Sequence, residues 1–112
     1  LGMAPLVREL VHLGEVTPTA YTQTECFEAG VTFARAEGIV PAPEANHAVK
    51  GALTEALRCK EEGVGRTILF NLCGHGYFDM QAYTDYAAGN LQDQAYDESE
   101  VAMALAGLPS VA

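Results

Sequence analysis

Hydrophobic residues recur at spacings of three and four in several stretches of the chain, the pattern that places them on one face of a helix. Residues 5–13 follow this pattern, with a proline in the first turn and Gly14 as a stop. Thr22 and Glu25 have the spacing of a capping box, which predicts a second helix to about residue 36. Gly30 lies inside that helix at a cost of about 1 kcal/mol relative to alanine, and a close contact with another helix would explain it.

The longest helical pattern covers residues 43–62. Its apolar positions share one face, its charged residues take the other, and Gly63 follows its end. The expected buried face consists of Val49, Ala52, Leu53, Ala56 and Leu57. Shorter helices are predicted over residues 79–88, with Asp79 as the cap, and over residues 99–106.

A nearly continuous apolar run, without a helical repeat, occupies residues 66–73. Such a run is typical of a strand that is buried on both faces, as in a parallel sheet. Residues 19–22 are the other strand candidate, and one short partner is too few for a buried strand. We therefore expect an α/β, helix-dominated fold with four to five helices and about two short strands. Its sheet would be completed by self-association or by a missing part of a larger protein.

The chain length of 112 residues predicts a single domain, residues 1–112, that buries about two thirds of its unfolded surface. Hydrophobic residues make up 49% of the chain, yet there are four phenylalanines and no tryptophan. The core is therefore expected to rest on closely packed helices rather than on large side chains. The chain opens with Leu1 instead of methionine, which is expected of a piece cut from something larger, of a trimmed product or of a chain with an unusual start.

Charge is distributed unevenly along the chain, with 15 acidic and 6 basic residues and a formal net charge of −9. This balance argues against nucleic acid and anionic membranes as partners, because both require a basic footprint. No apolar run reaches the length of a membrane span. All lysines and arginines lie at or before Arg66, so the charged residues after it are all acidic. We interpret the acidic excess as a solvated face, with a docking surface for a basic partner as the alternative.

Cys26, Cys59 and Cys73 are an odd number of cysteines without a closely spaced pair. They are typical of a reducing, cytoplasmic setting and not of a disulfide framework. Cys73 is expected to be buried and unreactive at the end of its strand. No cysteine or histidine spacing resembles a zinc site, so no metal is expected.

Gly74, His75 and Gly76 follow the predicted apolar strand and precede a helix. Ligands of α/β proteins bind at this position, and backbone amides in such a loop hold anions, but a tight turn explains the glycines equally well. Glu44, near a helix start, and His47, one turn later, form a second candidate. Either the two line a pocket together, or Glu44 only interacts favourably with the helix dipole.

Two long stretches of the chain resemble a known family. Residues 33–48 read FARAEGIVPAPEANHA, and residues 68–79 read ILFNLCGHGYFD. Together with GMAPLV near the start, their order and spacing resemble the C-terminal part of the tryptophan synthase beta chain, best its second, TrpB-like type. The resemblance covers essentially all 112 residues, and the tail from residue 90 resembles that family's own C-terminus.

The resemblance implies an enzyme of fold type II that uses pyridoxal phosphate to join serine to indole by β-replacement. By position, Glu44 matches the family's glutamate beside the cofactor ring. Cys73 stands where the family usually has the serine that hydrogen-bonds the pyridine nitrogen, and a thiol is a weaker hydrogen-bonding group than a hydroxyl. Gly74, His75 and Gly76 match the loop that follows this serine, so these five positions are the implied cofactor-binding residues.

The resemblance covers only the last part of the family pattern, which leaves out the family's Schiff-base lysine and its glycine-rich phosphate loop. Lys50 and Lys60 lie on the outward face of the longest predicted helix, in sequence contexts unlike the family's lysine motif. Without an activated lysine we expect no covalent catalysis, assign no catalytic residue and expect no cofactor on this chain alone.

Three functions are compatible with these features. The first is a stand-alone or truncated module that is not catalytic alone and associates with itself, as a dimer, to cover apolar surface. The second is a fragment of a pyridoxal phosphate-dependent tryptophan synthase that supplies part of the cofactor pocket to a separate chain carrying the missing N-terminal part. The third is an acidic protein-interaction domain. We favour the first, because the sheet is incomplete and the lysine is missing.

Overall fold

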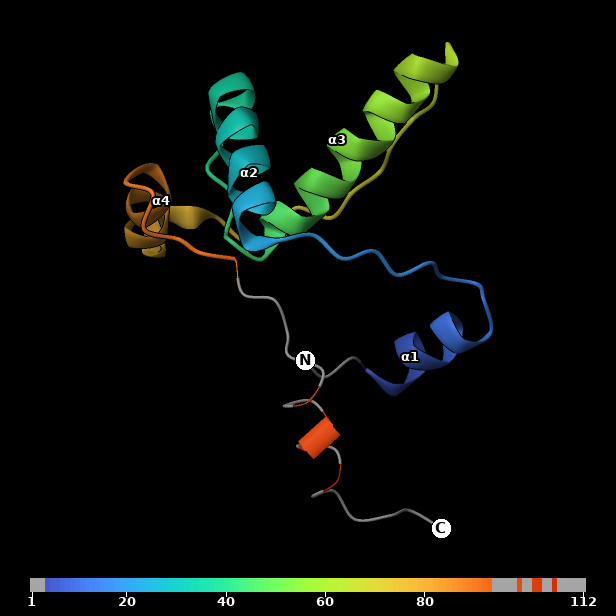
Figure 1. The fold of residues 1–112 in the computed structure, drawn as a ribbon. Coiled ribbons are helices and arrows are strands. Elements are labelled where there is room, and N and C mark those ends of the chain that lie inside the picture. Colours follow the sequence, from blue (N-terminus) through green and yellow to red (C-terminus); the bar gives the residue numbers. More distant parts are fainter. Residues whose placement is uncertain (1–3, 94–98, 100–101, 104–105, 107–112) are drawn as a thin grey trace.

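The computed structural model describes residues 4–93 together with residues 99, 102, 103 and 106 (Figure 1). Its helices are α1 (Pro5–His12), α2 (Gln23–Glu37), α3 (Ala45–Glu62) and α4 (Met80–Ala87), with a 3-10 turn, η1 (Gly76–Phe78), before α4. The helix-dominated part of the predicted fold is confirmed. The helix expected over residues 99–106 falls largely outside the described residues.

The ends of α2 and α3 follow the signals in the sequence. The Thr22 hydroxyl accepts a hydrogen bond from the Glu25 amide at 3.4 Å, and the Glu25 carboxylate accepts one from the Thr22 amide at 2.9 Å, so the predicted capping box is confirmed. Gly38 and Gly63 end the two helices in the left-handed conformation, with φ of 72° and 69°. α3 begins at Ala45 rather than at residue 43, which makes Glu44 its N-cap.

The predicted cap of α4 is correct in position only. Asp79 is the N-cap residue, but its side chain makes no capping hydrogen bond. The Tyr83 amide instead donates a hydrogen bond to the Asp79 backbone carbonyl at 3.4 Å. The start of α4 is therefore secured by backbone contacts with the η1 turn before it.

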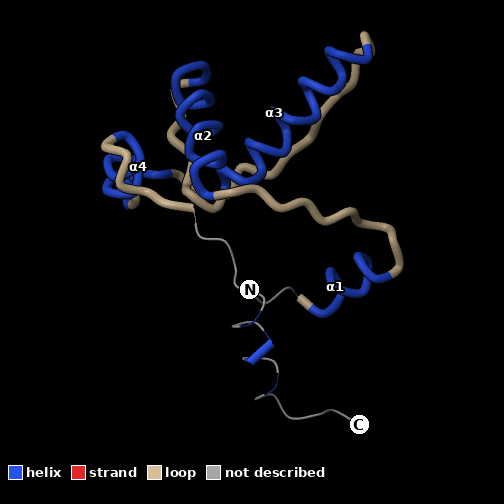
Figure 2. The backbone as a smooth tube through the Cα atoms, in the orientation of Figure 1, coloured by secondary structure: helices blue, strands red, loops and turns tan. Residues whose placement is uncertain are grey.

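The core lies where α2 meets the first half of α3 on one side and α4 on the other (Figures 1 and 2). The Phe27 ring of α2 meets the Tyr83 ring of α4 edge-on at 5.0 Å and stacks on the Tyr86 ring at 5.5 Å. A Cβ atom at Gly30 would lie 2.1 Å from the Oδ1 atom of Asn46 on α3. The close helix contact predicted at Gly30 is thus confirmed.

The two predicted strands are wrong, because the described residues contain no strand. Residues 66–73 are extended and run back along α3 (Figure 2), but no backbone hydrogen bond joins them to another described segment. Side-chain burial still alternates along the segment as it does along a strand. Ile68 and Phe70 are half-buried, whereas Leu69 between them is 97% exposed. The physical reason is that a strand needs neighbours for its backbone groups, and the described chain supplies none.

Much apolar surface is left uncovered. Val49, in the first half of α3, is buried, but Leu57 in the second half is 59% exposed, although the sequence places both on the buried face. α1 stands apart from the core and has no buried residue (Figure 1). The Cα radius of gyration is 17.1 Å, against about 13 Å for a compact domain of this length.

Candidate functional site

The two loops singled out in the sequence lie side by side. The Gly76 amide donates to the Val40 carbonyl at 2.8 Å, and the Ala42 amide donates to the Gly74 carbonyl at 3.1 Å. These bonds form an isolated antiparallel bridge centred on Pro41. Pro41 and His75 face each other as a non-hydrogen-bonded pair, in which neither residue donates its amide to the other. The missing N–H of proline therefore removes no hydrogen bond from the bridge. Residues 40–44 and 73–76, the paired loops, are therefore held as one unit.

Two glycines permit this close approach. A Cβ atom at Gly76 would lie 2.6 Å from the Pro41 carbonyl oxygen and 2.8 Å from a methyl carbon of Val40. Gly74 has a φ of 88°, a conformation that ends the extended run before it. Tight packing thus explains both glycines. The Gly76 amide is also engaged with Val40, so it does not point into open solvent to meet an anion.

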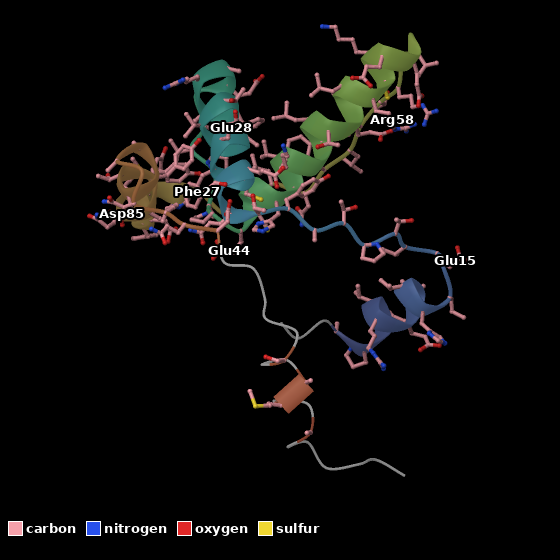
Figure 3. The ribbon with its side chains drawn as sticks, viewed as in Figure 1. Glu15, Phe27, Glu28, Glu44, Arg58 and Asp85 are labelled. Atoms are coloured by element: carbon pink, nitrogen blue, oxygen red, sulfur yellow. The ribbon has the colours of Figure 1, made fainter. Side chains whose placement is uncertain are left out.

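The side chains of the predicted site lie at the surface. Glu44, Cys73 and His75 are all exposed, and Figure 3 shows Glu44 at the base of the helices, where the chain enters α3. The prediction that Cys73 is buried is wrong. Its strand position alternates with the inward Ile68 and Phe70, and without neighbouring strands the outward face is bare. The Glu44 carboxylate makes no capping hydrogen bond to α3.

His75 sits in a small exposed aromatic cluster. Its ring lies 4.5 Å from the Tyr77 ring and 5.7 Å from the Phe78 ring, and Phe78 is 91% exposed. The Tyr77 amide donates to His75 Nδ1 at 3.4 Å. A neutral imidazole that accepts at Nδ1 carries its proton on Nε2, so His75 presents a donor outward.

The lysines of the chain are placed away from the paired loops. Lys50 Nζ lies 3.8 Å from a Glu25 carboxylate oxygen and 5.8 Å from the centre of the Tyr21 ring. Lys60 is exposed and follows Glu44 by 16 residues, which is about 24 Å along the helix axis. Among the residues described, no lysine amine contacts either loop.

The paired loops supply only some of the groups that a pyridoxal phosphate site needs. They offer an exposed carboxylate at Glu44 and an exposed thiol at Cys73. They offer no amine for a Schiff base, and the Gly76 amide is already bonded to Val40 and so is not available to an anion.

Beneath the loops lies a buried polar cluster that sequence reasoning missed. The Tyr83 hydroxyl donates to the Pro41 carbonyl at 2.6 Å, and the Asn46 side-chain amide donates to the Tyr83 oxygen at 3.0 Å. A signal was present, since Asn46 precedes the buried Val49 by three positions and so lies on the same face of its helix. A polar residue on an apolar helix face needs a buried partner.

The acidic end of the described chain has a structural role. Asp93 accepts hydrogen bonds from the Thr24 amide at 3.0 Å and from the Thr24 hydroxyl, at the first turn of α2. The bond from the Thr24 side chain lowers the pKa of Asp93. Of the carboxylates in the predicted acidic docking surface, Asp97, Glu98 and Glu100 lie outside the described residues.

The described part of the chain contains neither a metal-binding cluster nor a membrane-spanning helix. No group of three or more histidine, cysteine or acidic side chains there is arranged to hold a metal ion. No helix among the same residues has both the length and the apolar character needed to cross a membrane.

Comparison with known proteins gives a consistent set of relatives, although no family model matches the chain. The chain is 62% identical over 92 residues to the tryptophan synthase beta chain 2 of Aquifex aeolicus, a match that covers 82% of this chain. It is 54% identical over 92 residues to the tryptophan synthase beta chain 2 of Pyrococcus abyssi. It is 51% identical over 96 residues to the tryptophan synthase beta chain of Thermococcus gammatolerans. These matches cover 21 to 22% of each relative, so the chain spans about one fifth of their length.

Proposed function

Because the chain is homologous to a segment of the tryptophan synthase beta chain, we propose that it forms one wall of the pyridoxal phosphate site of such an enzyme. The observation that carries this proposal is the pairing of residues 40–44 with residues 73–76. These two loops lie within the stretches that carry the family resemblance, and their Glu44, Cys73 and His75 side chains are exposed.

Each exposed side chain has a distinct task in this proposal. Cys73 faces the pyridine nitrogen, Glu44 lies beside the ring, and the paired loops exclude water from one side of the cofactor. Pyridoxal phosphate, when bound, supplies the electron sink for replacing the hydroxyl of serine with indole. Because a thiol is a weaker hydrogen-bonding group than a hydroxyl, Cys73 holds the ring nitrogen less firmly than a serine at this position.

The remainder of the site comes from the part of the enzyme that this chain does not contain. The chain alone is not catalytic in this proposal, because Lys50 is engaged by Glu25 and Lys60 lies far along α3. A polypeptide that carries the missing lysine and phosphate loop must therefore dock against it.

The extended segment 66–73 is the surface on which we expect that polypeptide to dock. Its backbone groups have no partner among the described residues, and it contains no charged side chain after Arg66. Beside it lies an open groove of about 250 Å³ with an almost entirely apolar lining. The groove is lined by Phe33, Val49, Ala52, Leu53, Ala56, Ile68 and Phe70. An apolar strand of the missing part satisfies both features by pairing with the segment.

The proposal is tested by complementation. The chain is mixed with a polypeptide that carries the missing part of the enzyme, pyridoxal phosphate is added, and the visible aldimine absorption band is recorded. We expect the band in the mixture only. The variant Cys73→Ser is expected to bind the cofactor several-fold more tightly, because it restores a hydroxyl at the ring nitrogen. A band from this chain alone, or no band from a stable complex of the two chains, would overturn the proposal.

A second candidate function is self-association of the isolated chain. The extended segment 66–73 supports it, because an exposed apolar segment with unpaired backbone groups pairs readily with a second copy. The net charge of −9 opposes the approach of two copies. Added salt should therefore strengthen a dimer of this chain, as measured by sedimentation.

A further inference from the structure

A buried polar cluster joins the paired loops to the helices beneath them. This cluster consists of the Pro41 carbonyl, the Asn46 side chain and the Tyr83 hydroxyl, and we call it the Tyr83 cluster. Asn46 is completely buried and Tyr83 is 8% exposed. The bonds are short, at 2.6 Å from Tyr83 to Pro41 and 3.0 Å from Asn46 to Tyr83. No buried side-chain polar atom among the described residues lacks a partner.

The direction of these bonds follows from the number of protons available. A phenol has one proton, and the 2.6 Å bond to the Pro41 carbonyl uses it. Both polar atoms of the Asn46 side chain lie near the Tyr83 oxygen, with Nδ2 at 3.0 Å and Oδ1 at 3.2 Å. Because the phenol proton takes the shorter bond to Pro41, the Asn46 amide group donates to the Tyr83 oxygen. Burial raises the pKa of Tyr83, which keeps the hydroxyl protonated and able to donate.

Every element of the core touches this cluster. The Phe27 ring of α2 meets the Tyr83 ring edge-on, and Gly30 of the same helix leaves the space that the Asn46 side chain fills. A Cβ atom at Gly76 would lie 3.1 Å from the Tyr83 ring. The Tyr83 hydroxyl thus connects α4 to the first of the paired loops. That loop also continues directly into α3, where the Asn46 backbone amide donates to the Ala42 carbonyl at 3.2 Å.

We propose that Tyr83 is a positioning residue, which fixes the loop of Glu44 against the loop of Cys73 by holding the Pro41 carbonyl. Its importance to catalysis rests on the function proposed above. The loss of its hydroxyl leaves a buried carbonyl without a donor, so the loop shifts or opens to find water. The helices remain packed, because Phe27 still contacts the phenyl ring.

The test uses the one exposed cysteine as a reporter. Cys26 and Cys59 are buried, so a fluorinated thiol reagent should label Cys73 selectively in the folded chain. For Tyr83→Phe we expect the fluorine signal of the Cys73 label to shift or split. The amides of Ala42 and Gly76, which bridge the loops, are expected to exchange about 10-fold faster. Helical circular dichroism and exchange inside α2 should stay unchanged, which separates a positioning role from general destabilisation.

Tyr86→Phe is the matched control. Tyr86 lies on the same helix and stacks on the same Phe27 ring, but its hydroxyl makes no hydrogen bond to a described residue. We expect this variant to behave like the unaltered chain in both measurements. A Tyr83→Phe variant with an unshifted fluorine signal and unchanged exchange would overturn the inference. If that variant fails to fold, amide exchange is measured in the unaltered chain instead. Ala42 and Gly76 amides that exchange there as fast as the amides of the unbonded segment 66–73 would also overturn the inference.

The consequence for cofactor binding is measured separately. In the complex with the missing part of the enzyme, Tyr83→Phe is expected to raise the Kd for pyridoxal phosphate about 10-fold and Tyr86→Phe to leave it unchanged. An unchanged Kd together with shifted loops would overturn the link to the cofactor site. If neither protein binds the cofactor, the proposed function fails, while the fluorine signal and amide exchange still decide the role of Tyr83 in the loops.

Discussion

At the scale of single residues, contacts inside the core decide which side chain is tolerated. Gly30 illustrates this, because its absent side chain makes room for the fully buried Asn46. A glycine inside a helix is unfavourable by about 1 kcal/mol relative to alanine, so local propensity alone favours replacing it. Packing opposes that preference, because a side chain at this position would overlap Asn46. The free-energy cost of this overlap is larger than the gain in helix propensity.

We therefore predict that Gly30→Ala destabilises the chain. The new methyl group would lie 2.1 Å from Asn46 Oδ1, and overpacking a core of this kind lowers the free energy of unfolding by about 1 to 3 kcal/mol. Urea unfolding followed by circular dichroism measures the change. Gly51→Ala is the control, because no atom lies within 4 Å of a Cβ placed there on α3. It should raise the free energy of unfolding by up to about 1 kcal/mol. Equal effects of the two variants would contradict the prediction.

At the scale of elements, the sequence was sufficient wherever the signal is local. The capping box at Thr22 and the glycines after α2 and α3 act within a few residues, and the helices begin and end near them. The strand at residues 66–73 was predicted wrongly, because a strand depends on partners elsewhere in space. Its alternation of half-buried and exposed residues is nevertheless visible in the structure.

In the candidate site, too, the features that depend on residues far apart in the chain were not predicted from the sequence. Family resemblance predicted Glu44 and Cys73 as site residues. The structure connects their loops through hydrogen bonds from Gly76 to Val40 and from Ala42 to Gly74, which lie far apart in the chain. The burial of Cys73 was predicted wrongly, because it depended on neighbouring strands. The helical position of Asn46 indicates that it needs a buried partner but does not say which one. The Tyr83 cluster was missed because the bond from Tyr83 to Pro41 spans 42 positions.

The start of α2 should respond to acid. The hydrogen bond from the Thr24 side chain lowers the pKa of Asp93 below its ordinary value of 3.8 in the folded chain. The bound carboxylate therefore stabilises the fold above pH 3.8, and this contribution is lost as the pH falls through the lowered pKa. We predict that Asp93→Asn lowers the Tm at neutral pH by about 2 to 4 °C. The difference from the unaltered chain should vanish once the pH has fallen below the lowered pKa of Asp93.

Glu28→Gln is the control for this experiment. Glu28 lies on the same helix, its removal changes the charge equally, and its carboxylate makes no hydrogen bond to a described side chain (Figure 3). Its Tm should differ little from that of the unaltered chain at any pH. A pH-independent loss of stability in Asp93→Asn would show that the hydrogen bonds to Thr24 do not depend on the ionised carboxylate.

At the scale of the whole molecule, the described chain is an assembly of helices around a small core with one side left open. The open side combines the groove beside α3 with the unpaired backbone of residues 66–73. In both of our proposals this surface is the one that becomes covered, either by the missing part of the enzyme or by a second copy of the chain. The two outcomes therefore share one structural requirement, that an apolar partner covers the segment.

Leu69 tests that requirement directly, because it is 97% exposed at the centre of the segment. We predict that Leu69→Glu leaves the free energy of unfolding of the monomer within about 0.5 kcal/mol. The same variant should weaken association about 10-fold or more, because a charge replaces an apolar side chain that association buries. Analytical ultracentrifugation measures both the self-associated chain and its complex with the missing part. Leu13→Glu is the matched control, since Leu13 is also exposed, at 63%, but follows α1, away from the segment. Association that survives Leu69→Glu, or that is lost equally in Leu13→Glu, would show that the chain is completed through a different surface.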